Sequence, residues 1–246
     1  MKISTFFKTL NKIFKALNKN KFKFFLAWLL EIFFLIAALG EVFIFVILTT
    51  PYVKQALSLI EYQIANASPY EIINLDKILL ENPEFKIAFR QILRNIGALI
   101  LLFLFIFTFT RVLIWSLIKK IFKSEIRFLK LILFSIFWFV IYLIILILAI
   151  KSQELFAFKF LKILPFLILV LIANYFSLNS FAGGKLFSFN LKNAIAYFVF
   201  TIFIIIFALI LMMIKSTYLF VTILILYSII SILTKSFFEF NFKFRK

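Results

Sequence analysis

One stretch of the chain, residues 24–48, constrains the fold more than any other. Its sequence, FFLAWLLEIFFLIAALGEVFIFVIL, carries charge only at Glu31 and Glu41. A helix that crosses a bilayer needs about 20 consecutive apolar residues, so this stretch is long enough to span one. The whole chain agrees, because 65% of its 246 residues are hydrophobic and its mean hydropathy is +1.14. A soluble domain has roughly 45–50% apolar residues. We therefore expect an all-α, polytopic integral membrane protein.

Five more apolar stretches follow, and the charges between them predict the topology. The predicted spans are residues 24–48, 92–118, 131–150, 163–178, 194–214 and 217–233. The short segment 119–130 is rich in lysine and segment 51–90 is the least basic connection, so the positive-inside rule places 51–90 outside. We expect one membrane domain, residues 22–246, with six transmembrane helices in the cell membrane. Its outer loop lies at about 51–90, and both termini lie in the cytoplasm.

Residues 1–21 predict a basic amphipathic helix before the first span. Apolar residues recur at helical spacing, and lysines occupy the opposite face. The apolar positions are Ile3, Phe6, Phe7, Leu10, Ile13, Phe14 and Leu17, and the lysines are Lys8, Lys12, Lys15 and Lys19. Such a helix lies in the membrane interface or packs on the cytoplasmic ends of other helices. The net charge of +18 indicates a bilayer with anionic headgroups as the partner, rather than nucleic acid.

Four polar residues lie where lipid disfavours them: Glu31, Glu41, Arg111 and Asn174. Glu31 and Arg111 lie at similar depths, counted from the lysines that mark the cytoplasmic edge. We predict that they pair, because unpaired charges inside a membrane are costly. The alternative is that Arg111 extends alone to the headgroups. The glutamates indicate either a proton or cation path or residues that are protonated or paired within the bundle, with Arg94 and Asn95 as candidate partners of Glu41.

Local signals predict where some helices begin and end. Pro51 ends the apolar run of the first span. A capping signal predicts a short helix over residues 69–81. Asn82, which precedes a proline, predicts the start of a helix that continues into the second span.

Two segments leave alternatives open. The span at 163–178 is short and leads toward Gly183 and Gly184, which fits a broken helix at a substrate site or an ordinary short helix. Residues 238–244 alternate aromatic and polar side chains. This period of two fits an interfacial strand and a basic aromatic tail equally well.

The composition excludes much chemistry. The chain has no cysteine and no histidine, which removes thiol chemistry and any histidine-dependent general base. Common hydrolase, metalloprotease and nucleotide-binding motifs are absent from the sequence. We expect no enzyme activity, no catalytic residue, no metal and no cofactor. Three functions stay open: a non-enzymatic accessory or scaffold protein that holds protein partners or a second copy of itself, a small-solute or ion transporter or channel, and a membrane insertion or lipid-handling factor.

Overall fold

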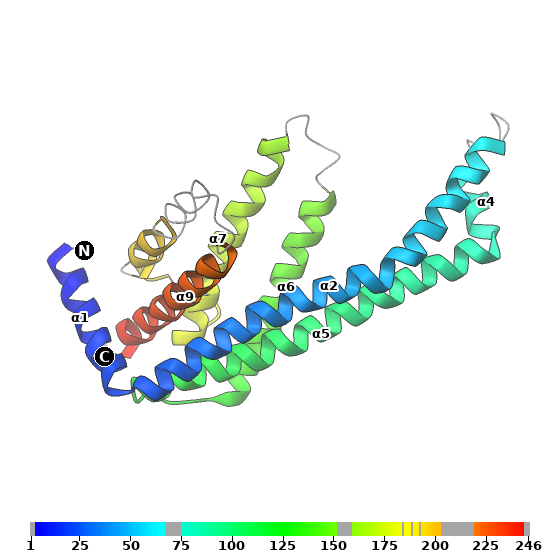
Figure 1. Cartoon of the computed structure of the whole chain (residues 1–246). Helices are drawn as coiled ribbons and strands as arrows, with labels where there is room; N and C mark the ends of the chain where they lie inside the picture. Colours follow the sequence, from blue (N-terminus) through cyan, green and yellow to red (C-terminus); the bar gives the residue numbers. More distant parts are fainter. Residues whose placement is uncertain are drawn as a thin grey trace. The chain divides into compact units, whose positions relative to one another are not determined.

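The computed structural model describes residues 3–66, 75–151, 159–183, 185–187, 189–191, 193–202 and 219–243 (Figure 1). Within these ranges almost every residue is helical and no strand occurs. The helices are α1 (Ile3–Lys19), α2 (Lys21–Asn66), α4 (Leu75–Glu81), α5 (Pro83–Ile121), α6 (Phe128–Lys151), α7 (Lys159–Gly183) and α9 (Leu219–Lys243), with a further short helix at Asn193–Ile202. The all-α fold is confirmed for this part of the chain.

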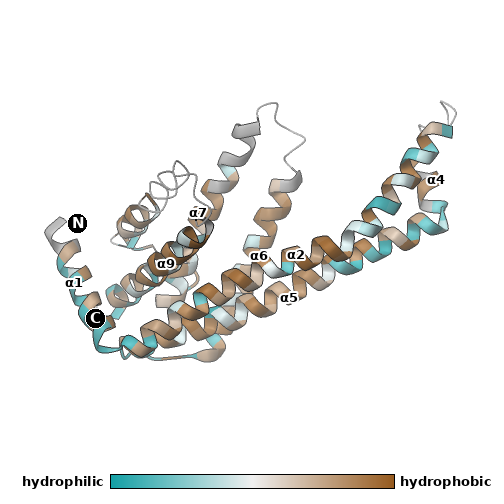
Figure 2. Cartoon of the chain, viewed as in Figure 1, coloured by the Kyte–Doolittle hydropathy of each residue, from teal (hydrophilic) through white to brown (hydrophobic). Residues whose placement is uncertain are grey.

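Four helices are long and apolar enough to cross a bilayer. They are Lys21–Asn66, Pro83–Ile121, Phe128–Ala149 and Val221–Lys243. Figure 2 shows the apolar stretches along α2, α5 and α6. These helices suggest a membrane protein, as the sequence predicts. The predicted fourth and fifth spans coincide with two shorter apolar segments, Ile168–Gly183 within α7 and the helix Asn193–Ile202, and part of the fifth span lies outside the described residues. The count of six spans therefore stays a prediction.

The chain divides into two compact units. The first is formed by Met1–Leu35 with Phe107–Lys246, and the second by Ile36–Ile106. In the first unit α6 packs against α7, while α7 and α1 both pack against α9. Its core is aromatic, since Trp115 stacks on Phe181 with 5.5 Å between ring centroids and both rings are buried. Close packing of this kind drives helix association in lipid, where the hydrophobic effect between helices is weak.

Helix α1 confirms the helix predicted at the N-terminus. Ile13 and Leu17 are buried and α1 packs against α9, so this helix rests on other helices of its unit. Phe7 and Phe14 have exposed fractions of 63% and 51% and lie on the surface. The burial supports the interpretation that α1 packs on the ends of other helices.

The helix of the first span extends beyond the apolar run that Pro51 ends. Helix α2 passes through Pro51 and continues to Asn66. Proline removes one backbone hydrogen bond, which membrane helices tolerate where neighbouring groups compensate. Beside the proline, the Thr50 hydroxyl donates to the carbonyl of Val46 at 2.6 Å. The described part of segment 51–90 is therefore mostly helix rather than loop.

In the second unit, α2 and α5 lie against each other. Asn95 of α5 donates a hydrogen bond to the carbonyl of Leu48 of α2 at 3.3 Å. Asn82 begins α5 as predicted, because its side-chain oxygen accepts from the N–H groups of Glu84 and Phe85 at 2.9 and 3.1 Å. This is the N-cap arrangement that satisfies the first donors of a helix.

Helix α7 tests the prediction of a broken helix near residues 163–178, and α4 tests the prediction of a short helix at residues 69–81. Helix α7 is continuous from Lys159 to Gly183, which supports an ordinary helix over a broken one. Helix α4 forms the described part of the helix predicted at 69–81, and residues 69–74 lie outside the described ranges.

Helix α9 continues to Lys243, so the strand considered for residues 238–244 is wrong over the described residues. Adjacent side chains of a strand face opposite sides, yet Phe237 and Phe238 are both fully buried. Packing of a continued helix against α7 overrides the period of two in the sequence.

Candidate functional site

A buried carboxylate, that of Glu31 on α2, joins three helices of the first unit. Arg111 of α5 places Nη1 3.2 Å from Oε1 and 3.3 Å from Oε2. Lys235 of α9 donates to Oε2 at 2.6 Å, and Ser231, one turn earlier, donates to Oε1 at 2.8 Å. These four residues form the charge cluster. The predicted pairing of Glu31 with Arg111 is confirmed, and Lys235 adds a second cation.

The charge cluster holds two cations and one anion away from water. The exposed fraction of the side chain is 0% for Glu31, 2% for Lys235 and 16% for Arg111. The guanidinium also lies over two aromatic faces, with its central carbon 4.9 Å from the Phe34 centroid and 5.4 Å from the Phe107 centroid. Aromatic faces attract cations, which moderates the excess positive charge.

A second buried ion pair lies further along the same helices. Lys119 of α5 lies 3.1 Å from Glu239 of α9, and it also donates to the carbonyl of Ala182 in α7 at 3.2 Å. Beyond this pair, Lys243 donates to the carbonyl of Phe122. Residues later in α5 thus meet residues later in α9, so these two helices run in the same direction.

Side-chain amides connect α7 to its neighbours. Asn174, one of the predicted polar candidates, donates to the hydroxyl of Tyr197 at 3.2 Å. Asn193 donates to the side-chain oxygen of Asn179 at 2.9 Å, and Asn241 of α9 donates to Asn193 at 2.8 Å. Asn174 therefore contributes to a network of helix contacts that is separate, in its described hydrogen bonds, from the charge cluster.

The remaining candidate, Glu41, lies in the second unit. Only 5% of it is exposed, and within the part of the chain that the structure describes neither carboxylate oxygen has a hydrogen-bond partner. The suggestion that Arg94 or Asn95 pairs with it is wrong, because Asn95 bonds the α2 backbone instead. The structure thus brings two of the four candidates together.

Among the residues of these buried networks that sequence reasoning missed, Ser231, Lys235 and Glu239 all lie on α9. The last span was predicted to end at residue 233, which placed Lys235 and Glu239 in a tail. A signal was present, since the three residues recur at a spacing of four. On a continued helix this spacing puts them on one face.

Comparisons with protein-family models, with curated proteins and with solved structures find no match. Among the described residues, no group of three or more potential ligands lies together to hold a metal ion. Three donor atoms bond the Glu31 carboxylate: Nη1 of Arg111, which contacts both oxygens, the Ser231 hydroxyl and Nζ of Lys235. The cluster therefore links α2, α5 and α9 through one carboxylate.

Proposed function

We propose that the chain is a non-enzymatic accessory or scaffold protein of the cell membrane that binds a protein partner through one end of its α2–α5 hairpin. This proposal rests on one observation. Parts of α2 and α5 that extend past the thickness of a bilayer expose large apolar side chains. The sealed charge cluster supports it, because it favours a permanently closed bundle over a conducting one.

Helix α2 is too long for a bilayer. Its 46 residues extend about 69 Å at 1.5 Å per residue, against a hydrocarbon core of about 30 Å. Exposed charged side chains return at Lys54 and Glu61 of α2 and at Lys86 and Arg90 of α5. We define the hairpin tip as residues 51–66 and 83–94 of the second unit, and place it outside the hydrocarbon.

The hairpin tip exposes large apolar side chains from both helices. They are Val53, Leu57, Tyr62, Ile64, Ile87, Phe89 and Leu93. Lipid would cover such side chains within the hydrocarbon, but at the tip they lie beside charged groups. Exposed apolar surface that is rimmed by polar residues is typical of a protein interaction site. The partner is a second copy of this chain or another protein.

The direction of the helices supports a topology with both termini in the cytoplasm. The ion pair between Lys119 and Glu239 indicates that α5 and α9 run in the same direction. Two spans of the same direction are separated by an odd number of crossings. One crossing, by α6 alone, meets this condition. Three crossings, by α6, α7 and the helix at Asn193–Ile202, also meet it. Both arrangements return the C-terminus to the side of the N-terminus, and the lysine-rich segment 119–130 favours the cytoplasm.

A transporter or channel is the second candidate, and Glu41 is the observation that favours it. A buried carboxylate with no described hydrogen-bond partner is a candidate proton or cation site. An insertion or lipid-handling factor would need an open polar groove around Arg111. That guanidinium instead contacts Glu31 and two aromatic rings.

Site-specific photocrosslinking tests the proposed partner surface. A benzophenone amino acid at Leu57 or Ile87, which are 51% and 64% exposed, should form a discrete protein adduct in the native membrane. The matched control is Phe43, which is 67% exposed but lies within the predicted hydrocarbon depth. Mass spectrometry distinguishes a second copy from another protein. Absence of adducts at the tip, together with ion flux in vesicles that Glu41→Gln abolishes, would overturn the scaffold proposal in favour of transport.

A further inference from the structure

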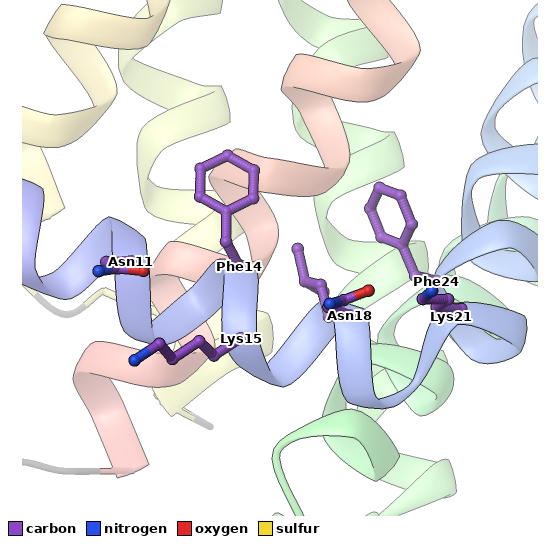
Figure 3. A pocket seen from close by; sticks show the side chains of 7 residues that line it. Asn11, Phe14, Lys15, Asn18, Lys21 and Phe24 are labelled. Carbon is purple, nitrogen blue, oxygen red and sulfur yellow. The ribbon is translucent and has the colours of Figure 1, made fainter.

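A pocket of about 510 Å³ lies where α1 ends and α2 begins (Figure 3). Its lining residues are Asn11, Phe14, Lys15, Leu17, Asn18, Lys21 and Phe24. Its volume falls in the range of about 300–1,000 Å³ that small-molecule sites occupy. All of the lining belongs to the first unit, whereas the hairpin tip belongs to the second.

The junction between α1 and α2, which we call the elbow, determines how the residues that line the pocket are arranged. Asn20 is the single residue between α1 and α2. Its backbone N–H donates to Leu17 and its side chain to Ala16, both at 3.0 Å, while its carbonyl accepts from Phe24 at 3.0 Å. These bonds hold the direction of α2 against α1, so the pocket is a built feature of the chain.

The pocket has an apolar part and a cationic part. Phe14 and Phe24 rise on the same side of the elbow in Figure 3, with Asn18 between them. Lys15 and Lys21 are exposed cations that line the same pocket.

We propose that this pocket binds one anionic phospholipid. Its phosphate lies between Lys15 and Lys21 and accepts a hydrogen bond from the Asn18 amide, and its acyl chains cover Phe14 and Phe24. A free phosphate would satisfy the cations but would leave the exposed half of Phe14 in water. The combination of charge and apolar wall therefore favours a lipid. This site does not depend on the scaffold proposal.

The chain offers a matched control for this site. Lys8 and Lys12 lie on α1, are exposed, and carry the same charge as Lys15 and Lys21, but they do not line the pocket. A diffuse attraction to an anionic surface would weaken equally when either pair is neutralised. A defined site would weaken only when the lining pair is neutralised.

The test is lipid retention by the full chain in micelles, measured by native mass spectrometry. We expect one phosphatidylglycerol to be retained per chain, with phosphatidylcholine retained far less and millimolar inorganic phosphate unable to displace it. Lys15→Gln with Lys21→Gln should weaken retention about thirtyfold, the effect of two lysine contacts of ordinary strength. Lys8→Gln with Lys12→Gln should change it much less, because neither lysine lines the pocket.

Three results would overturn the proposal. Equal loss in both double variants would show diffuse attraction, and displacement by inorganic phosphate would show a site for free anions. Equal retention of phosphatidylcholine would show that charge plays no part. Lys15→Arg with Lys21→Arg should keep binding, which separates loss of the charge contact from loss of folding.

Discussion

Arg111 shares the carboxylate of Glu31 with Lys235: Nη1 of the arginine lies 3.2 Å from Oε1, and Nζ of the lysine lies 2.6 Å from Oε2. One buried anion thus serves two cations from two other helices. Replacing each of the three residues should therefore change the free energy of unfolding by a different amount. Removal of the carboxylate would leave two buried positive charges without an anion. Removal of either cation would leave the carboxylate paired with the other cation.

Glu31→Gln should destabilise the protein far more than Lys235→Met. Breaking a buried pair by removing one partner costs about 3–5 kcal/mol, and we expect Glu31→Gln to reach this range. Lys235→Met should cost less than about 1 kcal/mol, since the Glu31–Arg111 pair remains. The free energy of unfolding in micelles measures both. Glu125→Gln, which breaks an exposed pair with Arg127, is the control. Equal losses for the two cluster variants would contradict the ranking.

A charge exchange between Glu31 and Arg111 should restore stability only in part. Glu31→Arg with Arg111→Glu recreates a pair, but the new arginine lies beside Lys235 and is repelled by it. Adding Lys235→Met should complete the recovery. The abundance of the folded protein in membranes reports the effect, relative to each single variant. Full recovery in the double variant would show that Lys235 lies further from the carboxylate than the structure places it.

The pairing of Glu31 with Arg111 could be predicted from the sequence because apolar length determines how deep a residue lies along a helix axis. Lys235 could not be placed this way, since a cation at the end of an apolar run looks the same whether the helix stops or continues. Pro51 ends the apolar run but not the helix, because proline weakens a helix locally while contacts elsewhere decide whether the helix continues. Asn82 was predictable because a cap depends on adjacent residues alone. Contacts between helices depend on packing, which a single sequence does not show.

Lys119 and Glu239 should be energetically coupled. The pair is buried and links α5 to α9, and residues that share a buried ion pair show coupling of about 0.5–3 kcal/mol in double-mutant cycles. We expect the cycle of Lys119→Met and Glu239→Gln to fall in the upper half of this range. The exposed pair of Arg127 with Glu125 should give about 0.5 kcal/mol or less. Unfolding in micelles supplies the four free energies of each cycle, and similar coupling for both pairs would argue against burial of the first.

Lys123→Gly should stabilise the turn after α5. Lys123 has a φ of 54°, a left-handed conformation that side chains disfavour and glycine adopts freely. Relief of this strain should add about 1 kcal/mol to the free energy of unfolding. Lys120→Gly is the control, because Lys120 is exposed on regular helix and the change should cost about 1 kcal/mol there. Destabilisation by both changes would show that Lys123 is not held in a left-handed conformation.

Gly183→Ala should destabilise the contact between α7 and the end of α9. A Cβ at Gly183 would overlap the ring of Phe242, so that ring must shift. Overpacking costs about 1–3 kcal/mol, and the better helix propensity of alanine offsets about 1 kcal/mol of it. Gly40→Ala is the control, since outside the adjacent backbone of its own helix no described atom lies within 4 Å of the added Cβ there, and it should be neutral or stabilising. Phe242→Leu should rescue Gly183→Ala by vacating the space. Failure of that rescue, with the control neutral, would mean that the ring is not what excludes a side chain at position 183.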